Sequence, residues 1–352
     1  DTLIINFVLK PKIETLKPII ISSNKIEKIL GQKPFYIIDY ELYNDNILLL
    51  ALKNAKSSKK ELILMNYIGD VICQRKVNKS SKKLFKDCTG NIQLLTNDSA
   101  FQINFTPSPK NIQLLYPITL KKFETILLPC LAVDSNKYFF YDNFYNKQGV
   151  VYYDIDNQAK KKKVITYIIS KEKLNHLKNE NNYLFEKYGY TQNEMISIKG
   201  KSLIAKSKNM AMTRHKESNI SYDKEIFFTP INSFFSIIKN QVAIFNFVDS
   251  QIEFYNFHDS LINNIKIEFN KYPNWQKKIF IDGVTNKAYT HYRKNGISTI
   301  SEIDINTACL ISTIKIPNFQ FVEKIKIRNG YIYFLYKNNL LMEYKKLYKM
   351  MM

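Results

Sequence analysis

The amino-acid sequence predicts an all-β protein, and more specifically a six-bladed β-propeller. Two observations carry this prediction: a composition typical of strands, and a turn-and-strand pattern that recurs at a nearly constant spacing. The chain has 352 residues, of which 24 are tyrosine and 23 are phenylalanine, against 9 glycines and 10 prolines. Aromatic and β-branched residues favour the pleated, half-buried surface of a sheet. With 45% hydrophobic residues, a chain of this length can also bury a large core.

The recurring pattern is an asparagine in a turn, followed by a strand of branched or aromatic residues. It is clear in YNDNILLLAL (43–52) and in TGNIQLLTND (89–98). The turn asparagines are Asn46, Asn91, Asn136, Asn240, Asn286 and Asn329. Their separations are 45, 45, 104, 46 and 43 residues. Asparagine suits such turns because it tolerates positive φ and bonds its own backbone. A period in the forties with several short strands indicates a propeller blade.

Each repeat also contains a further pair of strands. In segment 59–77, two apolar strands flank a Tyr-Ile-Gly-Asp turn, and we expect 37–77 to form the first complete blade. Residues 322–349 supply only the inner strands of the last blade. The N-terminal segment 1–10 is therefore expected to complete that sheet and close the ring, which removes the open edges of the array.

The long interval of 104 residues exceeds one repeat by about 59 residues. We predict that residues 170–225 form an irregular insertion between blades, within a single domain of residues 1–352. The segment is polar and weakly alternating, and its start, KEKLNHLKNE, fits a short helix. A degenerate seventh blade is the alternative, because Asn182 follows Asn136 by 46 residues. Long excursions in compact domains are usually functional or disordered.

Three segments carry a resemblance to a known family: ELILMNYIGDVICQRKV (61–77), FKDCTGNIQLLTNDSAFQINF (85–105) and FFTPINSFFSIIKNQVAIFNF (227–247). They resemble the six-bladed β-propellers of Gram-negative cell envelopes, near the NHL and TolB-like propellers. The resemblance implies export to the periplasm or association with the outer membrane. The absence of an initiator methionine favours the same expectation, as do three Asp-Ser/Thr-apolar triplets similar to bacterial O-glycosylation acceptors, which begin at Asp1, Asp98 and Asp259.

The net charge of +21 invites a nucleic-acid interpretation, which the details weaken. Only four of the 52 basic residues are arginine, the side chain that favours bidentate contacts with bases and phosphates. The lysines are spread along the whole chain, as expected of a solvated surface. We therefore do not expect a nucleic-acid partner; a polysaccharide or an anionic membrane is the alternative. No apolar run is long enough for a transmembrane segment.

No catalytic constellation or cofactor motif is found in the sequence. The four histidines have no metal-binding spacing, and no nucleophile elbow, P-loop or dinucleotide-binding motif occurs. The pairs Asp154/Asp156 and Glu302/Asp304 fit solvent-exposed acids at blade hairpins. We predict no catalytic residues, no metal and no cofactor.

The cysteines are Cys73, Cys88, Cys130 and Cys309, and none forms a C-x-x-C pair. Cys73 and Cys130 lie in apolar stretches, as expected of buried thiols. A disulfide between Cys73 and Cys88, on neighbouring strands, remains open in an oxidising compartment.

Two clusters are candidates for partner binding. The first is Tyr289, His291, Tyr292 and Arg293 in YTHYRK, expected at a strand end; the second is Met210, Met212, Arg214 and His215 in the insertion. Aromatic, Met and Arg side chains are enriched at protein interfaces, although ordinary polar loops would also fit.

The sequence thus predicts a non-enzymatic propeller scaffold that binds another envelope protein, for example as an accessory subunit of an outer-membrane transport or secretion complex. The alternative is a carbohydrate- or ligand-binding propeller enzyme, a lyase or hydrolase, that uses Tyr, His and Arg side chains at the axis.

Overall fold

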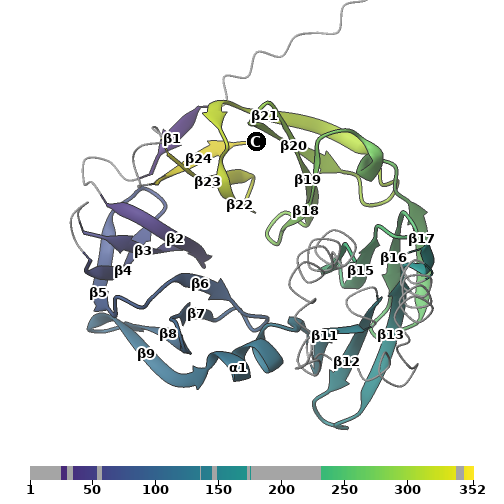
Figure 1. Cartoon of the computed structure of the whole chain (residues 1–352), viewed down its shortest axis with the longest axis horizontal. Coiled ribbons are helices and arrows are strands. Elements are labelled where there is room, and N and C mark those ends of the chain that lie inside the picture. The colour runs from purple at the N-terminus through teal and green to yellow at the C-terminus, as the bar shows by residue number, and fades with distance from the viewer. Residues whose placement is uncertain are drawn as a thin grey trace, which may run out of the picture.

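A computed structural model describes residues 25–29, 35–53, 58–134, 136–144, 149–172, 175, 231–337 and 345–352. It contains six four-stranded antiparallel sheets arranged as the blades of one ring (Figure 1). The prediction of an all-β, six-bladed propeller is confirmed. Most of the predicted insertion at 170–225, including Asn182, and the segment 1–10 lie outside the described residues.

The blades follow the chain order around the ring, and the first strand of each blade lies nearest the centre (Figure 1). Blade 1 comprises β2 (Tyr36–Tyr43), β3 (Asn46–Leu52), β4 (Lys60–Asn66) and β5 (Val71–Val77), and blade 2 comprises β6 (Lys83–Lys86), β7 (Ile92–Leu95), β8 (Ser99–Pro107) and β9 (Lys110–Thr119). Blade 3 comprises β10 (Cys130–Asp134), β11 (Lys137–Phe144), β12 (Gly149–Asp156) and β13 (Lys162–Ile169), and blade 4 comprises β14 (Ser233–Ile238), β15 (Gln241–Asn246), β16 (Gln251–Tyr255) and β17 (Leu261–Lys266). Blade 5 comprises β18 (Trp275–Asp282), β19 (Lys287–Lys294), β20 (Ile297–Ile303) and β21 (Leu310–Gln320), and blade 6 comprises β22 (Glu323–Arg328), β23 (Tyr331–Tyr336), β24 (Lys346–Met351) and β1 (Ile26–Lys28).

Blade 6 joins the two ends of the described chain. Strand β1 pairs antiparallel with β24, and the Ile29 amide donates to the Leu347 carbonyl at 3.1 Å. The prediction that an N-terminal strand closes the ring is confirmed, but the closing strand lies at Ile26–Lys28, later than the segment 1–10 that was expected to do so. Pairing β1 with β24 covers an edge that would otherwise be open to another chain.

All six predicted turn asparagines lie where the first strand of a blade turns into the second: five lie between the two strands, and Asn46 is the first residue of β3. Three of them have positive φ: Asn240 at 60°, Asn286 at 54° and Asn329 at 49°. In blades 1 and 2 a neighbour takes the left-handed position instead, Asn44 at 48° and Gly90 at 86°. The irregular interval falls between two complete blades, after β13 and before β14.

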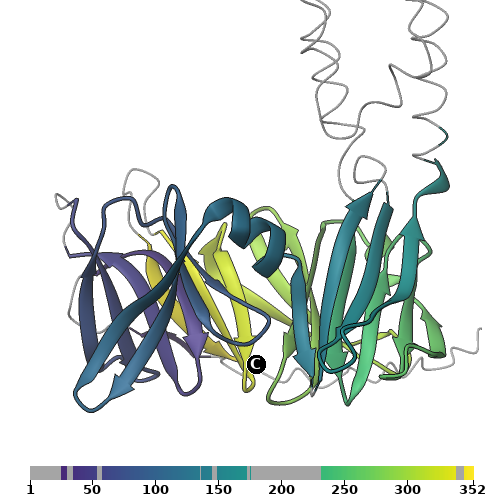
Figure 2. The same ribbon diagram turned by 90° about the horizontal axis from the view of Figure 1, so that it is seen from below.

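The ring has two faces, which we call upper and lower (Figure 2). The upper face carries the connections from one blade to the next, including α1 (Leu120–Lys122), the π-helix at Phe123–Leu127 and the 3-10 helix at Phe269–Lys271. The lower face carries the turns between first and second strands and those between third and fourth strands. No helix of the described segments is long and apolar enough to cross a membrane.

Five buried apolar clusters each lie between two neighbouring blades. Between blades 1 and 2, for example, Leu48 and Leu62 pack with Leu84 and Ile92. These clusters follow from the alternation of apolar residues along the strands, because both faces of each inner sheet contact another sheet.

The junction of blades 2 and 3 contains a disulfide between Cys88 and Cys130, with Cα atoms 5.6 Å apart. Phe85 also packs edge-on against Phe123 there, with ring centroids 5.1 Å apart. The proposed pairing of Cys73 with Cys88 is wrong, as is the expectation of a free thiol at Cys130. Cys73 lies on an outermost strand, β5, whereas Cys88 lies in the turn that follows the innermost strand β6, so the two are not on neighbouring strands.

Candidate functional site: the central channel and the upper face

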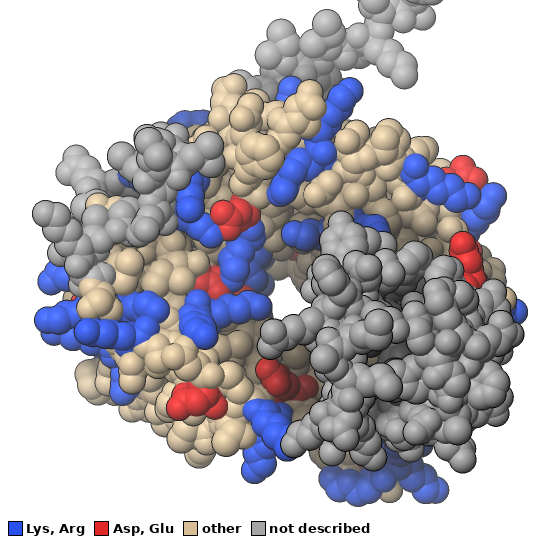
Figure 3. Space-filling model, in the orientation of Figure 1, with Lys and Arg blue, Asp and Glu red and all other residues tan. Residues whose placement is uncertain are grey.

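Charged side chains from blades 1 and 6 meet beside the central opening of the ring (Figure 3). On β22, Lys324 and Lys326 alternate with isoleucines, so both amines project from the same face of the strand. Lys326 Nζ lies 2.7 Å from the Glu41 carboxylate, and Lys324 contacts the Asp39 carboxylate. Both carboxylates are buried on β2. Two parallel ion pairs therefore bridge the point at which the ring closes.

The Asp39 carboxylate connects three blades. It accepts a hydrogen bond from the backbone amide of Leu84, on β6, at 2.8 Å, and it also contacts Lys324 of β22. The neighbouring Tyr40 hydroxyl donates to the Lys324 carbonyl at 2.6 Å. These contacts give the buried carboxylate a partner on each of two neighbouring blades.

Lys324 has the most perturbed amine of this group. Burial, together with the positive charges of Lys326 and Lys345, lowers its pKa to about 8. The contact with Asp39 acts in the opposite direction, because a carboxylate favours the ammonium form. Lys324 is therefore protonated at neutral pH, and its proton is held within the ion pair. The charges of Lys324 and Lys326 are thus balanced by those of Asp39 and Glu41.

The upper face over blades 1 and 2 carries a group of lysines that we call the upper basic patch. Its members are Lys53, Lys60, Lys79, Lys82 and Lys83, which lie at the upper ends of β3, β4 and β6 and in the connection between the two blades. All are exposed except Lys60, which is half-buried. In Figure 3, basic side chains gather over this side of the ring. None of the five forms an ion pair with any described residue.

Lys60 shows how close these charges lie. Its amine donates to the Ser81 carbonyl at 2.5 Å, which draws it toward the connection between the blades. Burial and the positive charge of Lys82 lower the pKa of Lys60. Like charges held this close produce a positive potential that attracts an anionic surface.

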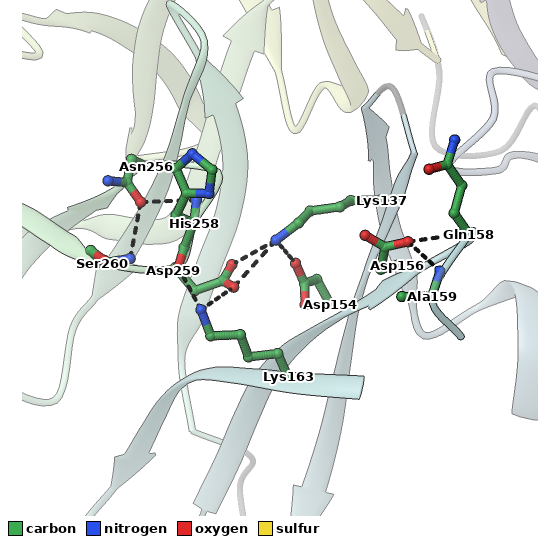
Figure 4. Close-up of polar contacts among 10 residues, drawn as sticks. All are labelled: Lys137, Asp154, Asp156, Gln158, Ala159, Lys163, Asn256, His258, Asp259 and Ser260. Atoms are coloured by element: carbon green, nitrogen blue, oxygen red, sulfur yellow. Dashed lines mark hydrogen bonds and ion pairs between the residues drawn. The ribbon is translucent and has the colours of Figure 1, made fainter. Parts of the chain in front are cut away.

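A second charged network links blades 3 and 4 (Figure 4). The Asp259 carboxylate lies 3.2 Å from Lys137 Nζ and 3.0 Å from Lys163 Nζ, and Lys137 also contacts Asp154. Burial and the nearby charge of Asp259 raise the pKa of Asp154. Burial lowers the pKa of Lys137, but its hydrogen bonds with the two carboxylates outweigh this and raise it. The network acts as a clamp between blades, because its two carboxylates are balanced by two amines.

The interpretation of Asp154 as a solvent-exposed turn acid is wrong, because its side chain is buried. A sequence signal for this existed. Asp154 shares one face of β12 with Val150 and Tyr152, which are both core residues. Period-2 alternation therefore places it on the buried side.

The predicted cluster in YTHYRK lies within β19, the second strand of blade 5, rather than at an exposed rim. Tyr289 and His291 are buried. The Tyr292 hydroxyl donates to the Phe269 carbonyl at 2.8 Å, and Arg293 Nη2 donates to the Val322 carbonyl at 2.9 Å. These side chains join blade 5 to the connections on either side of it. Because its side chain is buried, His291 cannot contact a large partner directly.

The second predicted cluster, Met210, Met212, Arg214 and His215, lies outside the described residues. Its role in partner binding stays a prediction. Among the described residues, no three His, Cys, Asp or Glu side chains are grouped so as to hold a metal ion.

His291 gives blade 5 a pH-dependent stability. Burial, then the charges of Arg293 and Lys278, lower its pKa to about 3, and its Nε2 lies 2.9 Å from Ser298 Oγ. The unfolded chain binds a proton near pH 6.5 whereas the native state does not, so stability is complete above that pH and falls as the pH drops. We expect a loss of about 2 kcal/mol between about pH 7 and about pH 4.5.

The measurement is urea unfolding across this pH range for the wild type and for His291→Gln, which keeps a donor near Ser298. The variant should lose this part of the acid sensitivity, although other groups will still titrate. Equal pH slopes for both proteins would show that His291 does not titrate on unfolding in this way.

Comparison with known proteins gives no family for this chain. No protein-family model matches, and no curated protein matches. A luciferin-regenerating enzyme has a TM-score of 0.45 at 9% identity, covering 94% of this chain and 96% of that one. The β-propeller domain of the Trilobed protease from Pyrococcus furiosus has a TM-score of 0.35 at 8% identity, covering 87% and 80%. A streptogramin B lyase has a TM-score of 0.36 at 8% identity, covering 93% and 97%. These similarities carry no activity over to this chain.

Proposed function

We propose that this protein is a β-propeller binding protein that recognises an acidic partner protein through the upper basic patch. The observation that carries the proposal is the contrast between two sets of charges. Lys324 and Lys326 beside the channel are neutralised by buried carboxylates, whereas the five lysines of the patch have no such partner among the described residues. Charge that is not used inside the fold is available to an acidic surface outside it.

Lysine chemistry favours a protein partner over a nucleic acid. Lysine acts as a flexible point charge, while recognition of bases and phosphates draws on the planar fork of arginine. The patch contains no arginine. A group of lysines suits steering and orientation of an acidic protein, with binding that weakens as salt is added.

We also propose that the protein works in the cell envelope, as an accessory subunit of an outer-membrane transport or secretion complex. The resemblance of the blade motifs to envelope propellers motivates this. The disulfide between Cys88 and Cys130 supports it, because structural disulfides persist in oxidising compartments such as the periplasm. Fractionation of the native cells tests the location: recovery in the cytosol with both thiols reduced would contradict it.

Charge reversal tests the proposed surface. The triple variant Lys53→Glu/Lys82→Glu/Lys83→Glu should weaken binding of a polyglutamate peptide by about tenfold or more at low salt, because like charges then face the ligand. The same variant should fail to recover acidic partners captured by the wild type from the native membrane fraction. Fluorescence anisotropy and quantitative mass spectrometry are the two measurements.

The matched control is Lys239→Glu/Lys294→Glu/Lys315→Glu. These three lysines are exposed and lie in blades 4 and 5, so the variant has the same net charge with the patch intact. We expect it to bind nearly as the wild type does. Equal weakening in both triple variants would mean that the total charge, and not the patch, attracts the partner.

A further inference from the structure

A cleft of about 370 Å³, lined by both polar and apolar side chains, lies between blades 5 and 6. Its walls come from β19, β20 and β21 of blade 5, from the β22–β23 turn at Gly330 and from Met352 after β24. The turn residues Thr285 and Gly330 place it toward the lower face, away from the upper basic patch. Its volume falls within the range of small-molecule sites, which begins at about 300 Å³.

The polar wall of the cleft contains one carboxylate and one amine that neutralise each other. Lys287 Nζ lies 2.9 Å from Glu302, and the Ser312 hydroxyl donates to Glu302 Oε2 at 3.4 Å. The Glu302 side chain is 17% exposed and that of Lys287 is 51% exposed. The carboxylate is thus held in place by its neighbours, and the amine reaches into solvent at the opening.

Tyr289 adds a phenol to this wall. Burial, then the charges of Glu302 and Asp282, raise its pKa to about 12, so it keeps its proton. Thr285 lies beside it and adds a second hydroxyl. Together with Ser312, these groups supply hydroxyls that both donate and accept hydrogen bonds. Tyr289 was singled out from the sequence as a contact residue for a partner protein, and here it faces a space the size of a small molecule.

From this arrangement we propose that the cleft binds a neutral polyhydroxylated ligand, such as a single sugar ring. The two oxygens of Glu302 can accept hydrogen bonds from two adjacent ligand hydroxyls, and Lys287 can donate to a third oxygen. Ile314 and Met352 supply an apolar surface for the C–H face of the ring. The balanced charges of Glu302 and Lys287 disfavour a charged ligand, because either sign would meet a like charge.

This ligand class does not depend on the acidic partner proposed above. The cleft and the upper basic patch lie on different blades and draw on different residues. Failure of one proposal therefore leaves the other unaffected.

Saturation-transfer NMR and calorimetry with the full chain test the cleft. The probes are methyl glycosides of neutral hexoses, with glucuronic acid and glucosamine as charged comparisons. We expect at least one neutral glycoside to bind, and Glu302→Gln to weaken its binding about tenfold, the effect of losing a charged hydrogen-bond acceptor. Ser312→Ala, which keeps the carboxylate but frees its orientation, should weaken binding less.

The control is Glu268→Gln, the same chemical change at an exposed glutamate that pairs with Lys266 outside the cleft. It should bind the glycoside as the wild type does, and circular dichroism should show the same fold in all variants. The proposal is overturned if no neutral glycoside binds, if Glu302→Gln binds as tightly as the control, or if the charged sugars bind better than the neutral ones.

Discussion

Replacing Asp39 with alanine is expected to lower the free energy of unfolding by about 3–5 kcal/mol, the usual effect of removing one partner of a buried ion pair. Asp39 is buried. Its carboxylate accepts a hydrogen bond from the Leu84 amide at 2.8 Å and forms an ion pair with Lys324. Truncation leaves an ammonium and an amide without their acceptor at the junction of three blades. Chemical denaturation monitored by circular dichroism measures the loss.

Two further variants separate charge from shape. Asp39→Asn keeps an oxygen that can accept from Leu84, so it should lose less than alanine does. The double variant Asp39→Ala/Lys324→Met removes both charges and should recover part of the stability, because no uncompensated ammonium remains. A single Asp39→Ala variant as stable as the wild type would show that the two ion pairs do not hold the ring closed.

The blades could be predicted from sequence because their signals are local. A turn such as that at Asn286 needs only a residue that adopts positive φ next to an alternating strand, and both lie within about ten positions of each other. The repetition of this turn-and-strand pattern made the prediction stronger than any single copy of it could. Six equivalent turns at nearly equal spacing predict blades even though each strand alone is short.

The channel charges could not be predicted in the same way. Asp39 and Lys324 are 285 residues apart, and only closure of the ring brings β2 beside β22. In the segment YIIDYELY, the alternation of acidic with apolar residues indicates a buried charge. No feature of this segment indicates which residue pairs with that charge. The predicted partner of Cys88 was wrong for the same reason. Cys73 lies on the preceding blade, whereas the actual partner, Cys130, lies on the following one.

The place of the YTHYRK segment in the fold could not be predicted for a different reason. An aromatic residue, a histidine and an arginine close together are as typical of an interblade seam as of a binding rim. In this chain, Tyr292 and Arg293 donate to backbone carbonyls of the connections that flank blade 5. Composition alone does not distinguish the two, because both environments need groups that combine an apolar body with a polar end.

The junction between blades 2 and 3 differs from the other five in how it is held. Within the described part of the chain, the five buried apolar clusters span the remaining junctions, and none of them reaches this one. Its contacts include the Phe85–Phe123 pair and the disulfide from the β6–β7 turn to the first residue of β10. Since a closed ring is only as stable as its junctions, the covalent bond supplements the smaller apolar contact of Phe85 with the buried Phe123 here.

Removing this disulfide should therefore have a large effect. For cysteines 42 residues apart, the loop-entropy relation predicts that Cys88→Ala/Cys130→Ala lowers the free energy of unfolding by about 4 kcal/mol. The control Cys73→Ala/Cys309→Ala removes the two free thiols and should change stability by less than half as much, because Cys309 is exposed and Cys73 only half-buried. Denaturant unfolding gives the two free energies of unfolding, and hydrogen exchange locates the change within the ring.

Faster exchange confined to blades 2 and 3 would show that the ring opens at this junction first. Faster exchange spread evenly over all six blades, or equal stability of the two double variants, would mean that the junction is held by its non-covalent contacts instead.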